Sequence, residues 1–307
     1  MPRLLSTAFL VALLAATTGA YAVTKDAKLE LAPIFATRAT TVFSPACDCD
    51  TAAATIGFRL RKRDRVTVWV ERDGKRVRTL ASGAAFAPGL PVSLVFDGIT
   101  EAGLTLPDGL YRPVVHLARQ HRTITLPEVI ELDTSPPTVR VPHRVYTHIS
   151  PDGDGRKDVF RVRYRLSDPG RAILLADGRE VVRSRGRKIE GTLAWNGRFG
   201  GRTARPGPHV LKVTAEDVAG NRAEPFPFAV VTIRFVGLGR PRVVAKPGTH
   251  FAILVLSDAP RVSWLFNRVR GVTSPGTVRF QAPRKRGVYR LYVSASEHAA
   301  RALVVVG

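Results

Sequence analysis

The sequence Ser-Pro-Asp-Gly-Asp-Gly at residues 150–155, followed by Phe-Arg-Val-Arg-Tyr-Arg-Leu at residues 160–166, has an earlier counterpart in the same chain. The counterpart reads Ser-Pro-Ala-Cys-Asp-Cys-Asp at residues 44–50 and continues to Phe-Arg-Leu at residues 58–60. The leucine follows the serine at the same spacing in both copies. A period of roughly one hundred residues is too long for a solenoid repeat and is typical of whole domains in series.

A second pair of motifs repeats further along each copy. Phe-Asp-Gly at residues 96–98 precedes Gly-Leu-Tyr at 109–111, and Trp-Asn-Gly at 195–197 precedes Gly-Pro-His at 207–209. A third instance, Gly-Val-Tyr at 287–289, stands alone. A glycine turn followed by an aromatic anchor at a strand entry is similar to the corner found in immunoglobulin-like sandwiches.

Composition and turn chemistry also favour strands. The chain has 26 Gly and 22 Pro between short runs of Val, Thr, Leu and Ile, and Asp-Gly at residues 73–74 and 177–178 predicts two hairpin turns. We therefore predict an all-β protein of tandem immunoglobulin-like β-sandwich domains. Because an aromatic ring at a strand edge supplies a large core area, Tyr111, Trp195 and Tyr289 are predicted to be buried structural residues.

The repeat boundaries and the amino-terminal pattern predict five segments. These are a signal peptide or N-terminal membrane anchor (1–23), a lead-in segment (24–42), a first domain (43–135), a linker with a second domain (136–236) and a short C-terminal β-sandwich (237–307). Ala-Tyr-Ala at residues 20–22 has the form of a signal-peptidase site, but the apolar stretch is also just long enough to span a membrane. In either case the bulk of the chain is expected outside the cytoplasm, secreted or anchored to the cytoplasmic membrane.

The net charge is +22, and only nine of the 47 basic residues are Lys. One interpretation is that arginine codons are frequent in a GC-rich genome and that the side chains are simply solvated. The other is an anionic partner, because a large like-signed charge attracts polyanions. Export argues against nucleic acid, which leaves anionic wall polymers and acidic glycans, and the membrane is involved only through the amino-terminal segment.

The motifs together resemble a known module. The acidic turn, the Gly-Arg-Glu-Val hairpin, Trp-Asn-Gly and Ala-Glu-Asp-Val-Ala-Gly-Asn at residues 215–221 resemble the immunoglobulin-like domain named after the flagellar hook-capping protein. The resemblance covers residues 150–221, extends in weaker form to 44–117 as a second tandem copy, and does not reach 237–307. It implies a module used for architecture or adhesion, and no catalysis. An export signal stands where a hook-binding region would be, which argues against a flagellar role.

Asp152, Asp154 and Asp158 form a D-x-D-G-x-x-D turn. Carboxylates at this spacing can direct oxygens at one calcium ion, but they supply only about half of its usual six to eight ligands. The alternative is a turn in which the carboxylates cap backbone amides. We expect the capped turn, with calcium as the minority alternative and no other cofactor.

Cys47 and Cys49 occupy the matching turn of the first copy. Exported thiols usually become oxidised, yet residues i and i+2 can be bridged only where the chain bends. A Cys47–Cys49 disulfide, an intermolecular bridge and two free thiols are all open. A metal site is not expected, because two thiolates lack further ligands at a recognisable spacing.

Two rows of arginine alternate with apolar residues and are expected to line one side of a strand. They are Arg59, Arg61 and Arg63 in the first domain and Arg161, Arg163 and Arg165 in the second. Side chains in such a row lie about 6.6–6.8 Å apart, a spacing that can follow charges on a polymer. The same rows could instead protect an edge strand from aggregation.

No sequence motif announces an enzyme: G-x-S-x-G, H-E-x-x-H and a phosphate loop are all missing from the sequence. We predict no catalytic residue and a non-enzymatic exported or surface-anchored scaffold or adhesin. One alternative is a binding protein for anionic cell-wall polymers or acidic glycans. Another is an accessory module of a secreted hydrolase system, and a further surface protein is also open as a partner.

Overall fold

The computed structural model describes residues 9, 11–21, 31–142 and 145–307. The predicted all-β class is confirmed: beyond the helical residues 11–21, the regular elements of the described chain are strands. The predicted signal peptide or anchor, residues 1–23, lies only partly within the described residues. Among the residues that the structure describes, no helix is long and apolar enough to cross a membrane.

The first sandwich has a three-stranded layer in the order β1-β3-β6 and a second layer in the order β2-β9-β7-β4-β5, with β8 paired to β7. Its strands are β1 (Ile34–Ala39), β2 (Val42–Phe43), β3 (Ala54–Leu60), β4 (Asp64–Arg72), β5 (Lys75–Phe86), β6 (Pro91–Phe96), β7 (Gly109–Leu117), β8 (Arg122–Thr125) and β9 (Ile130–Leu132). Side chains that alternate inward from the two layers form one core.

The second sandwich is built around one long strand. Its strands are β10 (Val139–Arg140), β11 (Val145–Ile149), β12 (Phe160–Ala176), β13 (Arg179–Arg183), β14 (Lys188–Trp195), β15 (Arg198–Phe199), β16 (Arg202–Thr203), β17 (Gly207–Asp217) and β18 (Phe226–Ile233). The first half of β12 pairs with β10 and β14, and the second half pairs with β13 and β17. A register shift between Arg165 and Gly170 marks the place where β12 passes from one layer to the other.

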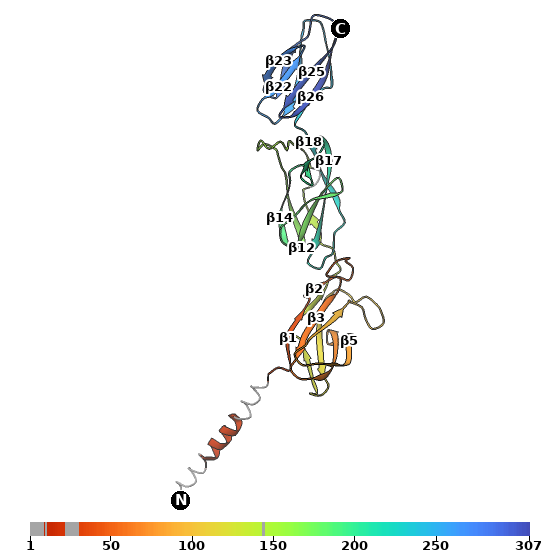
Figure 1. Cartoon of the computed structure of the whole chain (residues 1–307), viewed down its shortest axis with the longest axis vertical. Helices are drawn as coiled ribbons and strands as arrows, with labels where there is room; N and C mark the ends of the chain where they lie inside the picture. Colours follow the sequence, from red (N-terminus) through yellow and green to blue (C-terminus); the bar gives the residue numbers. More distant parts are fainter. Residues whose placement is uncertain (1–8, 10, 22–30, 143–144) are drawn as a thin grey trace. The chain divides into compact units, whose positions relative to one another are not determined.

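The third sandwich repeats this plan in fewer residues. Its strands are β19 (Val236–Leu238), β20 (Arg242–Ala245), β21 (His250–Ser257), β22 (Val262–Phe266), β23 (Val269–Thr273), β24 (Gly276–Gln281), β25 (Gly287–Ala295) and β26 (His298–Val306). One layer has the order β19-β21-β24 and the other β20-β26-β25-β22-β23; β22, β23, β25 and β26 are labelled in Figure 1.

All three sandwiches share one topology. Each has a three-stranded layer facing a longer layer, and in each an early short strand pairs in parallel with the last strand: β2 with β9, β11 with β18 and β20 with β26. The repeat seen in the first two domains therefore extends to the third, although the acidic-turn motif is not found there.

Two segments expected outside the domains belong to them. Strand β1 lies in the predicted lead-in, yet Ile34 is buried and pairs with Leu60 of β3. Strand β10 lies in the predicted linker and pairs with β12. Each segment completes a three-stranded layer, so the sandwiches begin earlier than their motifs. The chain divides into two compact units, residues 1–134 and 135–307.

The two halves of the repeated motif meet in space. Gly197 of Trp-Asn-Gly has a φ of +69°, and a Cβ built there would lie 2.8 Å from Cγ of Pro151. Gly98 of Phe-Asp-Gly has a φ of +74°, and a Cβ built there would lie 2.9 Å from Leu132 and 3.3 Å from Cγ of Pro45. The Ser-Pro turn and the later glycine therefore recur together because each needs the other's shape.

The glycine-aromatic motif forms the same corner three times. Each ring hydrogen-bonds the carbonyl oxygen four residues earlier: Tyr111 to Pro107, His209 to Arg205 and Tyr289 to Lys285. Tyr111 and Trp195 are buried, as predicted, whereas Tyr289 is half-buried. A hydroxyl or ring nitrogen that reaches back over its own strand entry is the device of the tyrosine corner in immunoglobulin-like sandwiches.

Candidate functional sites

The acidic turn before β12 is organised by its own carboxylates. Asp158 accepts hydrogen bonds from the backbone amides of Gly153 (2.9 Å) and Gly155 (2.7 Å). Asp154 accepts one from the amide of Arg156 at 2.7 Å. The carboxylates thus cap backbone amides, which is the geometry of the expected Asx-type turn.

The same three carboxylates are also the residues that could hold a cation. One oxygen each of Asp152, Asp154 and Asp158 lies within 4.8 Å of the others. Asp152 also accepts a hydrogen bond from the Ser296 hydroxyl at 3.0 Å. Three carboxylates that already accept hydrogen bonds are a partial ligand set for calcium, and calcium stays the minority alternative to the capped turn.

The matching turn of the first sandwich carries a disulfide. Cys47 and Cys49 are bonded to each other, with Cα atoms 5.3 Å apart. The bend required for a bridge at this spacing is present, because the amide of Cys47 bonds the carbonyl of Ser44 and the amide of Ala52 bonds that of Cys49. The disulfide thus holds the turn that carboxylates hold in the second sandwich.

The arginine row predicted for the first domain is not a strand row. Strand β3 ends at Leu60, so that only Arg59 lies on it, and Arg63 falls in the connection between β3 and β4. The Arg61 side chain donates to the carbonyl of Ala32 at 2.8 Å and lies 4.7 Å from the Phe35 ring centroid. Arg61 therefore fastens β1 to the sandwich instead of extending a row of free cations.

The row predicted for the second domain lies on β12. Arg161, Arg163 and Arg165 are exposed and alternate with buried neighbours, and none of them is in an ion pair with a described residue. Arg140 on β10 stands directly opposite Arg165, and both line a groove of about 480 Å³ with Ile189. The sequence offered no sign of Arg140, because its place beside the row depends on strand pairing.

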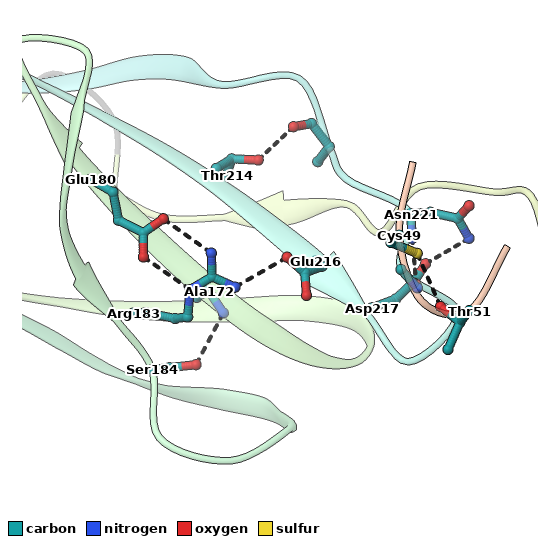
Figure 2. A network of polar contacts seen from close by, with 12 residues as sticks. Cys49, Thr51, Ala172, Glu180, Arg183, Ser184, Thr214, Glu216, Asp217 and Asn221 are labelled. Atoms are coloured by element: carbon teal, nitrogen blue, oxygen red, sulfur yellow. Dashed lines mark hydrogen bonds and ion pairs between the residues drawn. The ribbon is translucent and has the colours of Figure 1, made fainter. Parts of the chain in front are cut away.

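Elsewhere on the second sandwich, one arginine is paired with acidic side chains. Arg183 bonds Glu180 at 2.9 Å and Glu216 at 3.1 Å (Figure 2). The hydrogen bond from Arg183 is the main reason why the pKa of Glu180 is below its ordinary value. Asp217 caps the amides of Gly220 and Asn221 in the Ala-Gly-Asn turn. This network is structural, because its groups satisfy one another.

A second groove, of about 400 Å³, runs along β11, β17 and β18. Its described lining is apolar and aromatic: Val145, Tyr146, Val210, Pro227, Phe228, Ala229 and Val230. These residues offer apolar contact area to a ligand, and none of them is an acidic or basic side chain that could serve in general acid–base catalysis.

Comparison with known proteins finds distant similarity to solved structures. No family model matches the chain, and no curated protein matches it. Solved structures that it resembles include the fibronectin(III)-like modules of Clostridium thermocellum CbhA (15% identity, 64% of this chain and 94% of that chain, TM-score 0.33). Others are three N-terminal domains of the bacteriophage RB49 outer capsid protein Hoc (9%, 88% and 97%, 0.32) and the N-terminal four immunoglobulin domains of Dscam1 (13%, 88% and 72%, 0.22). These TM-scores are low, and the fold assignment rests on the strand topology.

Proposed function

We propose that the protein is a non-enzymatic scaffold, exported or anchored at the cell surface, that presents binding surfaces on a series of immunoglobulin-like modules. The observation that supports this most is that three sandwiches of one topology each have a core of their own. Modules of this kind leave their outer faces free for contacts. The resemblance of the second module to that of the hook-capping protein is part of this proposal.

The location is tested on intact cells. If the chain is displayed outside, a membrane-impermeant amine reagent should label it without lysis, and added protease should degrade it. A cytoplasmic protein of the same cells serves as the control. Protection of the chain until lysis would contradict the proposal.

Anionic wall polymers or acidic glycans are a second candidate, favoured by the row Arg161, Arg163 and Arg165 beside Arg140. Replacing the three arginines of the row by Ser should abolish retention on an anionic glycan column if the row is the site. Retention that persists while the variant aggregates would mean that the row protects the sheet from aggregation instead. Binding through many charges should also weaken steeply with added salt.

A further inference from the structure

The outer face of the longer layer of the third sandwich combines arginines with exposed apolar side chains. Alternation along β25 and β26 directs Tyr292 and Leu303 outward, while Leu291 and Val304 enter the core. The apolar residues of this face that are 38% to 71% exposed are Val244, Val272, Val288, Tyr292 and Leu303. Exposed apolar side chains that share a face with polar ones are a mark of an interaction site.

Strand register gathers three arginines around Leu303. Leu303 stands opposite Arg290 on β25 and opposite Arg242 on β20. Arg301 lies two residues before Leu303 on the same face and stands opposite Tyr292. Because neighbouring strands are about 4.8 Å apart, three guanidinium groups share one small area beside an exposed aromatic ring.

No acidic side chain neutralises this cluster within the described structure. Arg242, Arg290 and Arg301 form no ion pair with a described residue. The only acidic residues in the sequence between 237 and 307 are Asp258 and Glu297, and both lie in turns outside the strands of the face. No two of these arginines stand directly opposite each other, but like charges grouped this closely repel, so folding by itself does not favour the arrangement.

The other two sandwiches show that the shared topology does not require it. On the equivalent outer face of the first, Glu71 on β4 stands opposite Arg112 on β7. On that of the second, Arg171 on β12 stands opposite Glu216 on β17. Opposite charges paired across strands are stabilising. At these paired positions the first two modules place an acidic residue opposite the arginine, and the third module does not.

We propose that this surface, the arginine face (Arg242, Arg290, Arg301, Tyr292 and Leu303), binds an acidic polysaccharide. The planar guanidinium groups match carboxylate or phosphate oxygens in pairs, and the tyrosine ring and aliphatic side chains offer flat apolar area to sugar rings. A second copy of the chain is a poorer occupant, because two arginine faces would repel each other. The inference rests on the proposed function, since export is what would bring the chain to such a polymer.

The test uses the purified full chain and polygalacturonate as the probe. The triple variant Arg242→Gln, Arg290→Gln, Arg301→Gln should raise the dissociation constant about tenfold or more, because charge-assisted hydrogen bonds are lost. The matched control is Arg279→Gln, Arg284→Gln, Lys285→Gln, which removes the same charge from the same module; Arg279 lies on β24 and the other two in the loop before β25. The control should bind as the parent does. Tyr292→Ala should weaken binding, and Tyr292→Phe should retain it.

Several outcomes would overturn the inference: equal binding by the triple variant, equal loss in the control, or equal binding of a neutral dextran. Loss of binding only in the Arg161→Ser, Arg163→Ser, Arg165→Ser variant would place the site on the second module. Binding only to phosphatidylglycerol vesicles would make the face a lipid-binding surface.

The melting temperature of the triple variant should be unchanged or higher, because repulsion between the arginines is relieved. Arg301→Gln alone tests the site if the triple variant does not fold. Surface labelling of cells reports on export separately, so a protein that binds in vitro but is not displayed would refute only the proposed function.

Discussion

At the scale of the residue, Gly197 stabilises the second sandwich because it has a positive φ and leaves no room for a Cβ. Gly197→Ala should destabilise the protein by roughly 1–3 kcal/mol through backbone strain alone, and further because the new methyl group meets Pro151 and Ile149. Denaturant titration measures the loss. The control is Gly178→Ala, where φ is +80° but nothing lies within 4 Å of the added Cβ. Equal losses in the two variants would show that packing against Pro151 contributes nothing.

Asp64 gives the first sandwich a defined sensitivity to acid. The side chain is 1% exposed and accepts hydrogen bonds from the Arg119 amide (2.9 Å) and the Gln120 amide group (3.1 Å). Burial acts to raise the pKa of Asp64, but these hydrogen bonds outweigh it and hold the pKa below the ordinary value of 3.8. The stabilisation is complete above the unfolded-state pKa and is lost as pH falls through the folded-state pKa.

Asp64→Asn should therefore lower stability at neutral pH and flatten the loss of stability below about pH 4. Thermal melts across this range measure both effects. Asp73→Asn, at a side chain that is 90% exposed, is the control and should keep the acid sensitivity of the parent. An acid profile that is the same in Asp64→Asn and in the parent would contradict the assignment.

At the scale of the element, the acidic turn before β12 is expected to be complete without a metal. Its carboxylates already accept backbone amides, so calcium would have to displace or share those hydrogen bonds. Calcium should therefore leave the melting temperature unchanged. Since a ligand that binds only the folded state raises its melting temperature with dose, a clear rise that Asp154→Asn abolishes would establish calcium as part of the turn.

The elements that could be predicted are those with a local signal. Alternation in β12 and the Asp-Gly turns, where Asp73 and Asp177 have positive φ, are encoded by neighbours in sequence. Strand β1 was missed because its pairing with β3 depends on residues some twenty positions away. The arginine face depends on still longer pairings, such as Arg242 with Leu303. Local sequence patterns thus predicted the modules. Which charged side chains become neighbours is decided by strand register, and local patterns carry no information about register.

At the scale of the whole molecule, separate cores imply separate unfolding. Phe58 is 1% exposed in the first core and Leu291 is 0% exposed in the third, and no residue belongs to both cores. Phe58→Ala and Leu291→Ala should each cost about 2–5 kcal/mol through lost burial and a cavity. Because a chain of several domains need not unfold as one two-state unit, each substitution should lower the transition of its own module and leave the other in place. Scanning calorimetry resolves the transitions, with Arg279→Gln as an exposed control in the third module. A single transition that both core substitutions shift by the same amount would mean that the modules fold as one cooperative body, and the picture of independent modules that present their outer faces would fail.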